Sequence, residues 1–291
     1  MTRTFAFVAA LLFAVISVSS ACIAGPLPDS WSFELKPSLH DTSSLQLAMW
    51  QSGHDRRNNV SASSYAIREL VGLDYRAFIA NGASPIAFAV VREAGRIDCA
   101  GSGGNRLVAG RCRFTPDAAF SDYLASHGIA RPTRDEAFGL TMTRASRSLI
   151  EALAAAKYPR PDIDQLTALS ALDVSGRYIA ELAAGGFRPG TIDELTQFAA
   201  LKITPDYVEG LKRAGYPRMK ASEIVEFKAL DITPAYIASF ARAGFPNLDI
   251  DTLVELKALN VTPDFIRSLK AHGLHPRTAD QLVKLKIGLG E

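Results

Sequence analysis

Histidine is the residue type with which this chain could most readily bind a metal ion, and His272 and His275 lie close together in the sequence. Two histidines at that spacing can share one metal ion if a helix presents both. Gly273 between them, however, marks the end of a predicted helix, where histidines commonly cap free carbonyl groups. The other histidines have no further ligand at a metal-binding spacing. The sequence therefore predicts no metal site and no cofactor.

Motifs for nucleophilic catalysis and phosphate binding are missing as well. A serine nucleophile on a tight turn is expected within Gly-x-Ser-x-Gly, and Gly101-Ser102-Gly103 lacks that spacing. The glycines from Gly101 to Gly104 lead into a predicted strand without a following Lys-Ser or Lys-Thr pair, so they do not match a phosphate-binding loop. Because no acid, base and nucleophile come together by spacing, we expect no catalytic residues and no enzyme activity.

The second half of the chain has a 29-residue repeat, a period typical of repeat proteins. In the clearest copies, a threonine can cap a helix and the proline after it suits the first helical turn. A glycine at a fixed position farther along each copy is expected to end that helix in a left-handed conformation. The predicted caps are Thr204, Pro205, Gly215, Thr233, Pro234, Gly244, Thr262, Pro263 and Gly273.

Each unit continues with a second short helix, so the repeat is an antiparallel pair of helices. Helices of about ten residues are too short to be stable alone, and such pairs persist by stacking on one another. Five units at residues 144–287 predict an α-solenoid. Residues 115–143 resemble a degenerate first unit that starts at Thr115-Pro116 and has a short insertion directly after them.

Charged residues in the repeats follow the polarity of the predicted helices. Acidic residues such as Asp193 and Asp251 stand where second helices start, whereas basic residues such as Lys212 and Lys270 stand near the ends of first helices. The helix macrodipole favours this arrangement. A ligand is not needed to explain these charges.

Residues 25–114 show alternation of apolar and polar residues, which indicates half-buried strands. The alternation runs from Trp31 to Lys36, from Leu45 to Met49 and from Ile86 to Val90. Ser64 to Leu73 has helix-like spacing, so we expect one short helix there. The prediction is a small antiparallel β-domain of five or more strands with one helix, followed by the helical repeat, which makes the fold α+β.

A hairpin is predicted for residues 95–115, with Cys99 and Cys112 on the same face of its strands. Two cysteines in an oxidising compartment favour a disulfide, which forms readily only between directly opposite residues. Direct pairing implies a wide loop at positions 101–110. A tight turn at Gly104-Asn105 would instead place the cysteines diagonally, and the glycines of this segment favour the wide loop.

The hairpin and the repeats together resemble a known group of proteins. Gly-Arg-Ile-Asp-Cys-Ala-Gly at residues 95–101, a glycine-rich turn and Arg-Cys-Arg-Phe-Thr-Pro-Asp at residues 111–117 precede Phe120 and the 29-residue units. This order, over residues 85–291, is similar to bacterial envelope proteins of undefined role, also seen as the exported C-terminal region of some metallopeptidase-type antibiotic-sensor receptors. That family tends to have aromatic residues in the hairpin where this chain has cysteines, and the helical His-Glu-x-x-His signature of metallopeptidases is missing here. The resemblance implies an architecture and an envelope location, and no activity.

The segment 1–24 has the pattern of an export signal. A positive residue precedes an apolar run from Phe5 to Val18, which is too short to span a bilayer. Cleavage after Ala21 or after Ala24 suits a signal peptidase. Lipidation of Cys22 is an alternative, although Ser19 stands where lipoprotein signals normally have Leu or Val. We therefore expect a periplasmic or secreted protein without a membrane span.

Composition limits the classes of function. The formal net charge of the 291 residues is only +2, so no electrostatic argument favours nucleic acid as a partner. We expect the solenoid to act as a binding or scaffold module for a protein or peptide partner in the cell envelope, with envelope sensing as one role. The alternative is an envelope hydrolase or carbohydrate-binding protein with its site on the β-domain, around Trp31, Trp50 and Asp55 to Arg57. A convergent polar cluster in a pocket of the β-domain would favour that alternative.

Overall fold

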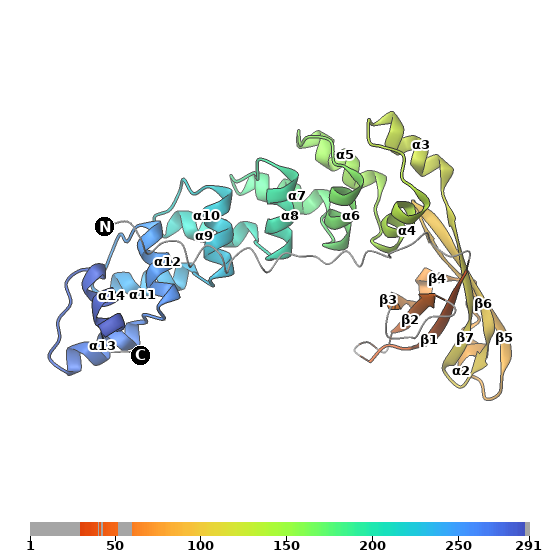
Figure 1. Ribbon diagram of the computed structural model, residues 1–291, viewed down its shortest axis with the longest axis horizontal. Coiled ribbons are helices and arrows are strands. Elements are labelled where there is room, and N and C mark those ends of the chain that lie inside the picture. Colours follow the sequence, from red (N-terminus) through yellow and green to blue (C-terminus); the bar gives the residue numbers. More distant parts are fainter. Residues whose placement is uncertain (1–29, 40, 42, 52–59, 289–291) are drawn as a thin grey trace. The chain divides into compact units, whose positions relative to one another are not determined.

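The computed structural model describes residues 30–39, 41, 43–51 and 60–288. The predicted export signal at positions 1–24, with Cys22 and both cleavage sites, lies outside the described residues. Within the described part, strands come first and helices follow (Figure 1). The predicted α+β fold class is therefore confirmed.

The chain forms two compact units. The first contains the residues up to Val91, together with Gly95–Pro116 and Thr133–Asp135, and it holds the strands. The second contains Arg92–Ala94, Asp117–Pro132 and Glu136–Glu291, and it holds the helical repeats. We call them the sheet unit and the helical unit. Among the described helices, none combines the length and the hydrophobicity that a membrane crossing requires.

Seven strands form one antiparallel sheet in the sheet unit. Their order in the sheet is β3-β2-β1-β7-β6-β5-β4, so two meanders are joined where β7 returns to pair with β1. The strands are β1 (Trp31–Pro37), β2 (Ser44–Gln51), β3 (Val60–Ala66), β4 (Leu70–Val71), β5 (Ser84–Arg92), β6 (Gly95–Gly104) and β7 (Leu107–Pro116).

The curl of this sheet buries its own apolar face. Phe33 and Leu35 of β1 are fully buried, and Glu34 between them points to the other face of the sheet and is half-buried. β1 and β5 are three strands apart in the sheet, which is about 14 Å in a flat sheet. The rings of Phe33 and Phe88 nevertheless meet edge to face, with centroids 5.3 Å apart. Burial of each such side chain contributes about 1.5–3 kcal/mol to folding.

The helix predicted at Ser64 to Leu73 is wrong. That segment contains the end of β3, a single 3-10 turn at Ile67–Glu69 and strand β4. Pairing of Tyr65 with β2 along the sheet prevails over the helix-like local spacing. The short helix of this unit, α2 (Tyr75–Ile79), starts later, where the side chain of Asp74 accepts hydrogen bonds from two backbone N–H groups of the first turn.

The hairpin of β6 and β7 carries the predicted disulfide. Cys99 and Cys112 are directly opposite and bonded, so this prediction is confirmed. The predicted wide loop is wrong, because both strands continue through the glycine segment to a tight turn at Asn105-Arg106. Both turn residues are left-handed, with φ of 52° and 65°, as a type I′ turn requires. The turn lies one position later than the tight turn considered from the sequence, and this shift aligns the cysteines.

Helices α3 to α14 form six consecutive pairs in the helical unit. We call the first member of each pair helix A and the second helix B. The A helices are α3 (Ala118–Ser126), α5 (Arg147–Ala155), α7 (Gly176–Ala184), α9 (Pro205–Arg213), α11 (Pro234–Ala243) and α13 (Pro263–Ala271). The B helices are α4 (Arg134–Met142), α6 (Ile163–Ala171), α8 (Ile192–Ala200), α10 (Ala221–Ala229), α12 (Ile250–Ala258) and α14 (Ala279–Gly288).

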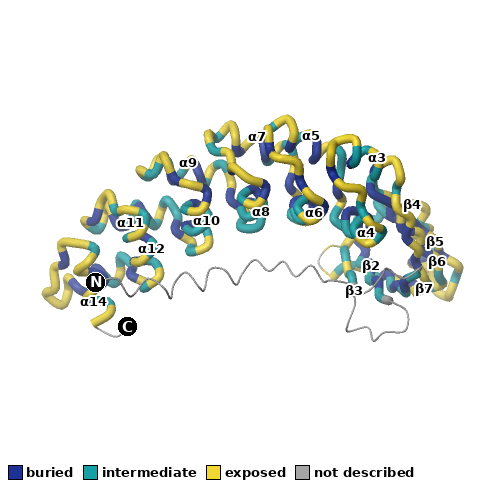
Figure 2. The backbone as a smooth tube through the Cα atoms, turned by 45° about the horizontal axis from the view of Figure 1, so that its top comes forward, coloured by how far each residue is buried: buried dark blue, intermediate teal, exposed yellow. Residues whose placement is uncertain are grey.

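Helices A and helices B form two rows, and residues at their facing sides are buried (Figure 2). Leu211 of α9 and Phe227 of α10 are almost fully buried, and they belong to a core that extends over successive pairs. Each pair therefore hides its apolar side on its neighbours, which is what short stacked hairpins need for stability.

The first helix pair keeps the repeat period without an insertion. The side chain of Asp117 accepts a hydrogen bond from the backbone N–H of Phe120, so Asp117 is the N-cap of α3. The prediction that Thr115-Pro116 starts this helix is wrong, because both residues belong to β7. Aspartate caps a helix as well as threonine does, so it can replace the Thr-Pro pair.

Candidate binding site

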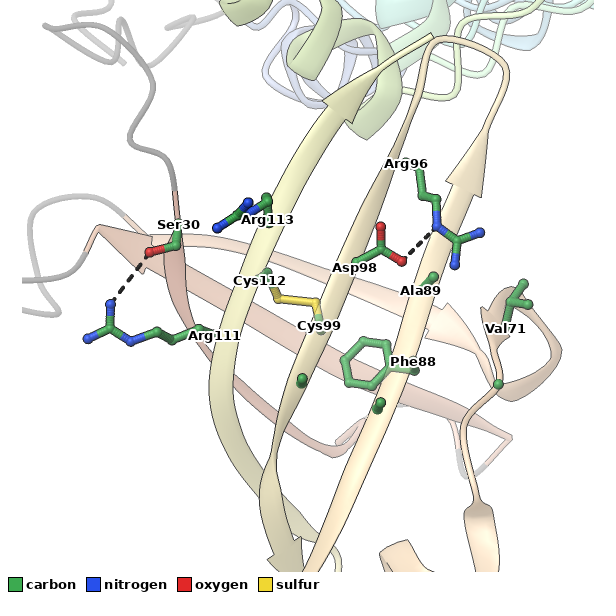
Figure 3. A pocket seen from close by; sticks show the side chains of 13 residues that line it. Ser30, Val71, Phe88, Ala89, Arg96, Asp98, Cys99, Arg111, Cys112 and Arg113 are labelled. Atoms are coloured by element: carbon green, nitrogen blue, oxygen red, sulfur yellow. Dashed lines mark hydrogen bonds and ion pairs between the residues drawn. A yellow bond between two sulfur atoms is a disulfide. The ribbon is translucent and has the colours of Figure 1, made fainter.

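A hollow of about 730 Å³ lies on the outer face of the sheet, over β5, β6 and β7 (Figure 3). Its charged residues are Arg96 and Asp98 on β6 and Arg111 and Arg113 on β7. The other lining residues are Ser30, Val71, Gly72, Ala87, Phe88, Ala89, Cys99, Ala100 and Cys112. The hollow belongs entirely to the sheet unit.

The alternation of the strands places these charges on the outside. Cys99 and Cys112 point into the core, so their neighbours on each strand must point outward. Asp98 lies opposite Arg113 in the ladder, and Ala100 lies opposite Arg111. The disulfide beneath them therefore fixes the register of the two strands that carry the charges.

The charges of the hollow are unequally compensated. The Nε atom of Arg96 lies 2.6 Å from Oδ1 of Asp98, so these two form an ion pair. With the described residues, Arg111 makes one long polar contact, 3.5 Å from its Nη1 to the hydroxyl of Ser30. Among the described residues, no carboxylate forms an ion pair with Arg111 or Arg113. The hollow therefore has an excess of positive charge on the side of Ser30.

A second charged surface lies on the helix B row. Glu226 of α10 and Glu255 of α12 occupy equivalent positions of successive repeats, the sixth in each helix. Burial, followed by the negative charges of Asp251 and Glu223, raises the pKa of Glu226. We call Glu226, Asp251 and Glu255 the acidic face. The macrodipole explains Asp251 in a first helical turn, but it does not explain the two glutamates farther along.

The repeat residues singled out from the sequence lie at helix ends. The hydroxyls of Thr204, Thr233 and Thr262 accept hydrogen bonds from the backbone N–H groups of Tyr207, Tyr236 and Phe265. Pro205, Pro234 and Pro263 begin helices α9, α11 and α13. Gly215, Gly244 and Gly273 have φ of 107°, 102° and 78°, in the left-handed region. These residues set the geometry of the stack and do not form a site.

Histidines and metal-ligand clusters do not define a site in the described part of the chain. His272 is the C-cap of α13, and its Nδ1 lies 2.8 Å from the carbonyl oxygen of Ser268. His275 is exposed. The described residues contain no group of three or more His, Cys, Asp or Glu that could hold a metal ion.

Of the β-domain residues considered for the alternative function, only the two tryptophans lie in the described part of the chain. Trp31 is buried in the core, and Trp50 is half-buried. Asp55 to Arg57 lie outside the described residues. The sequence did not lead us to Arg111 and Arg113 as site residues. The signal was present, because the alternation that puts Cys112 and Phe114 on the inner face puts these two arginines on the outer face.

No family model matches the chain, and no curated protein or solved structure matches it either.

Proposed function

We propose that this protein is an exported protein of the bacterial cell envelope that acts as a binding or scaffold module through its helical repeats, without enzyme activity of its own. The observation that carries this proposal is the stack of helix pairs. Such a stack presents a long surface that can follow an extended partner. The Cys99–Cys112 disulfide supports export, because disulfides persist in oxidising compartments.

The acidic face supports a proposal for the chemistry of the partner. Ser222, Glu226 and Ala229 lie on one side of α10, and the equivalent positions of the next repeat lie on one side of α12. The carboxylate of Glu226 is disfavoured by burial and by neighbouring negative charges. A cationic group placed beside it would relieve that repulsion. These charges favour a partner protein with a basic segment that would lie across α10 and α12.

Capture from an envelope fraction tests this proposal. The mature chain serves as bait beside two variants that each remove two negative charges. Glu226→Gln/Glu255→Gln changes the acidic face, and Asp206→Asn/Glu209→Gln changes α9, the helix A paired with α10, where both residues are exposed. The proposal requires that a basic protein be retained by the parent and by the helix A variant, and lost by the helix B variant. Equal retention by all three baits argues against it.

Export is tested separately by mass spectrometry of the protein from cells. A mature N-terminus at Cys22 or at Gly25, with Cys99 and Cys112 resistant to alkylation before reduction, is the expected result. An intact Met1 and two labelled thiols would place the protein in a reducing compartment.

The β-domain supports a second candidate function, which is ligand binding in the arginine-lined hollow. The specific observation is the pair Arg111 and Arg113, which lack acidic ion-pair partners among the described residues.

A further inference from the structure

We propose that the hollow on the outer face of β5, β6 and β7 binds an acidic saccharide, whose carboxylate is held by the guanidinium groups of Arg111 and Arg113. This site belongs to the sheet unit and is separate from the acidic face of the helices. Its existence does not depend on the partner proposed for the helical repeats.

The charge arrangement points to an anionic ligand. Arg111 and Arg113 alternate with Cys112 on β7, so their Cα atoms are about 7 Å apart and both side chains leave the same face. Figure 3 shows both on the Ser30 side of the hollow, with Asp98 and Arg96 on the other side. Asp98 is already paired with Arg96, so within the described ranges no carboxylate competes with a ligand for the guanidinium groups of Arg111 and Arg113. Arginine can hold a carboxylate through two parallel hydrogen bonds.

The shape of the hollow suits a ligand larger than a single anion. Ala87 and Ala89 of β5 and Ala100 of β6 form a floor of methyl groups on the β5 side of Arg111 and Arg113. Such a floor can accept the apolar side of a sugar ring, while Ser30 and the Asp98–Arg96 pair offer hydrogen bonds to hydroxyl groups. A volume of about 730 Å³ accommodates more than one ring.

A peptide fits the same surface less well. β6 and β7 lie inside the sheet, with a paired strand on each side, so their backbone N–H and C=O groups are used within the ladder. An extended peptide normally binds a sheet by adding a strand at a free edge. Recognition at this hollow must instead come from side chains, and the side chains present favour carboxylate and hydroxyl groups over backbone amides.

Titration of the mature protein with trigalacturonic acid, followed by calorimetry, tests the proposal. We expect saturable binding that weakens as the salt concentration rises. Arg111→Gln/Arg113→Gln should weaken binding at least tenfold. Arg68→Gln/Arg76→Gln removes the same charge from exposed positions of the same unit outside the hollow, so it should change the affinity less than twofold. Arg113→Lys keeps the charge and loses the planar guanidinium group, so its affinity should lie between the affinities of the two double variants.

Three probes decide the ligand class. The methyl ester of trigalacturonic acid should bind at least tenfold more weakly than the acid. Tetraglutamate and inorganic phosphate should each bind more weakly than trigalacturonate. The proposal is overturned if trigalacturonate does not bind saturably, if both double variants lose affinity equally, or if tetraglutamate or phosphate binds as tightly. Near-ultraviolet circular dichroism of each variant must match the parent, since both hollow arginines are exposed and their replacement should leave the core intact.

Discussion

The hydroxyl of Tyr207 donates a hydrogen bond of 2.7 Å to the backbone carbonyl of Ile232, which belongs to the next pair of the stack. The same bond recurs from Tyr178 to Ile203 at 2.8 Å and from Tyr236 to Val261 at 3.3 Å. Each of these tyrosines is the third residue of its helix A, and each acceptor immediately precedes the threonine cap of the following helix A. The repeat thus preserves a polar contact between successive pairs as well as the buried apolar side.

Loss of this contact should weaken the stack. Tyr207→Phe is expected to destabilise the helical unit by about 1 kcal/mol, because a hydrogen bond contributes about 0.5–1.5 kcal/mol and its acceptor is left without that partner. Urea unfolding followed by far-ultraviolet circular dichroism measures the change. Tyr75→Phe, at an exposed position of the sheet unit, is the matched control and should change the midpoint little. Equal effects of the two variants would show that the bond between pairs contributes nothing.

The same tyrosines make the stack sensitive to alkaline pH. Burial, with a smaller contribution from Tyr158, raises the pKa of Tyr178 to about 12, and burial also raises the pKa of Tyr207 and Tyr236. The folded state therefore holds these protons more tightly than the unfolded chain, whose tyrosines titrate near 10. Their contribution is fully present below about pH 10 and falls as the pH rises above it, for Tyr178 as the pH reaches about 12.

A variant with phenylalanine at Tyr178, Tyr207 and Tyr236 isolates this effect from lysine titration in the same range. Its unfolding midpoint should fall less between pH 9 and pH 11 than that of the parent. If the unfolding midpoints of the parent and the variant fall equally over this range, the three tyrosines are not the cause of the loss of stability.

Two adjacent glycines offer an internal comparison of backbone conformation. Gly185 has φ of −70° and Gly186 has φ of 74°. A methyl group at Gly185 would be 3.4 Å from its nearest neighbour, an ordinary contact, so Gly185→Ala should stabilise the fold by about 0.5–1 kcal/mol. Gly186→Ala should destabilise it by about 1 kcal/mol, because the left-handed region disfavours a Cβ atom. Thermal unfolding that ranks the two variants in the opposite order would contradict the described helix end.

The N-cap of α10 is the weak point of the helix B row. Lys220 has no side-chain oxygen to accept from the first turn, whereas Thr191 of the preceding pair accepts from the backbone N–H of Glu194. Lys220→Thr should therefore stabilise the protein by about 1 kcal/mol. Thr191→Ala, which removes the cap of α8, should destabilise the protein by a similar free energy. Denaturant unfolding of both variants checks the two predictions, and a destabilising Lys220→Thr would be evidence against the helix start at Ala221.

Local chemistry explains why the repeats could be predicted from the sequence. Thr204, Pro205 and Gly215 act within one helix, so their spacing alone identifies its ends. The same local logic missed Asp117, because a different residue type makes the same cap. In the first of the five full units, Lys157 stands in the place of the glycine, and it still adopts the left-handed conformation with φ of 59°.

The sheet was harder to predict, because strand pairing is decided by distant residues. Tyr65 and its neighbours became a strand through pairing with β2, although their local spacing resembled a helix. The register of the disulfide depended on a turn without glycine, at Asn105-Arg106, and the surrounding glycines suggested a loop instead. The alternation of the hairpin did contain the outward arginines, but only the assembled face brings Arg111 and Arg113 together with the alanine floor.

Site-specific photo-crosslinking in living cells tests the central claim, that the helix B row is the binding surface, most directly. A photoreactive amino acid is placed at Ala229 or Ala258, which are exposed on α10 and α12, and in control proteins at Ala180 or Ala235, which are exposed on helices A. We expect both helix B positions to cross-link to the same basic envelope protein and the helix A positions not to cross-link to it. Cross-links to that protein from the helix A positions alone, or none from any of the four, would contradict the central claim.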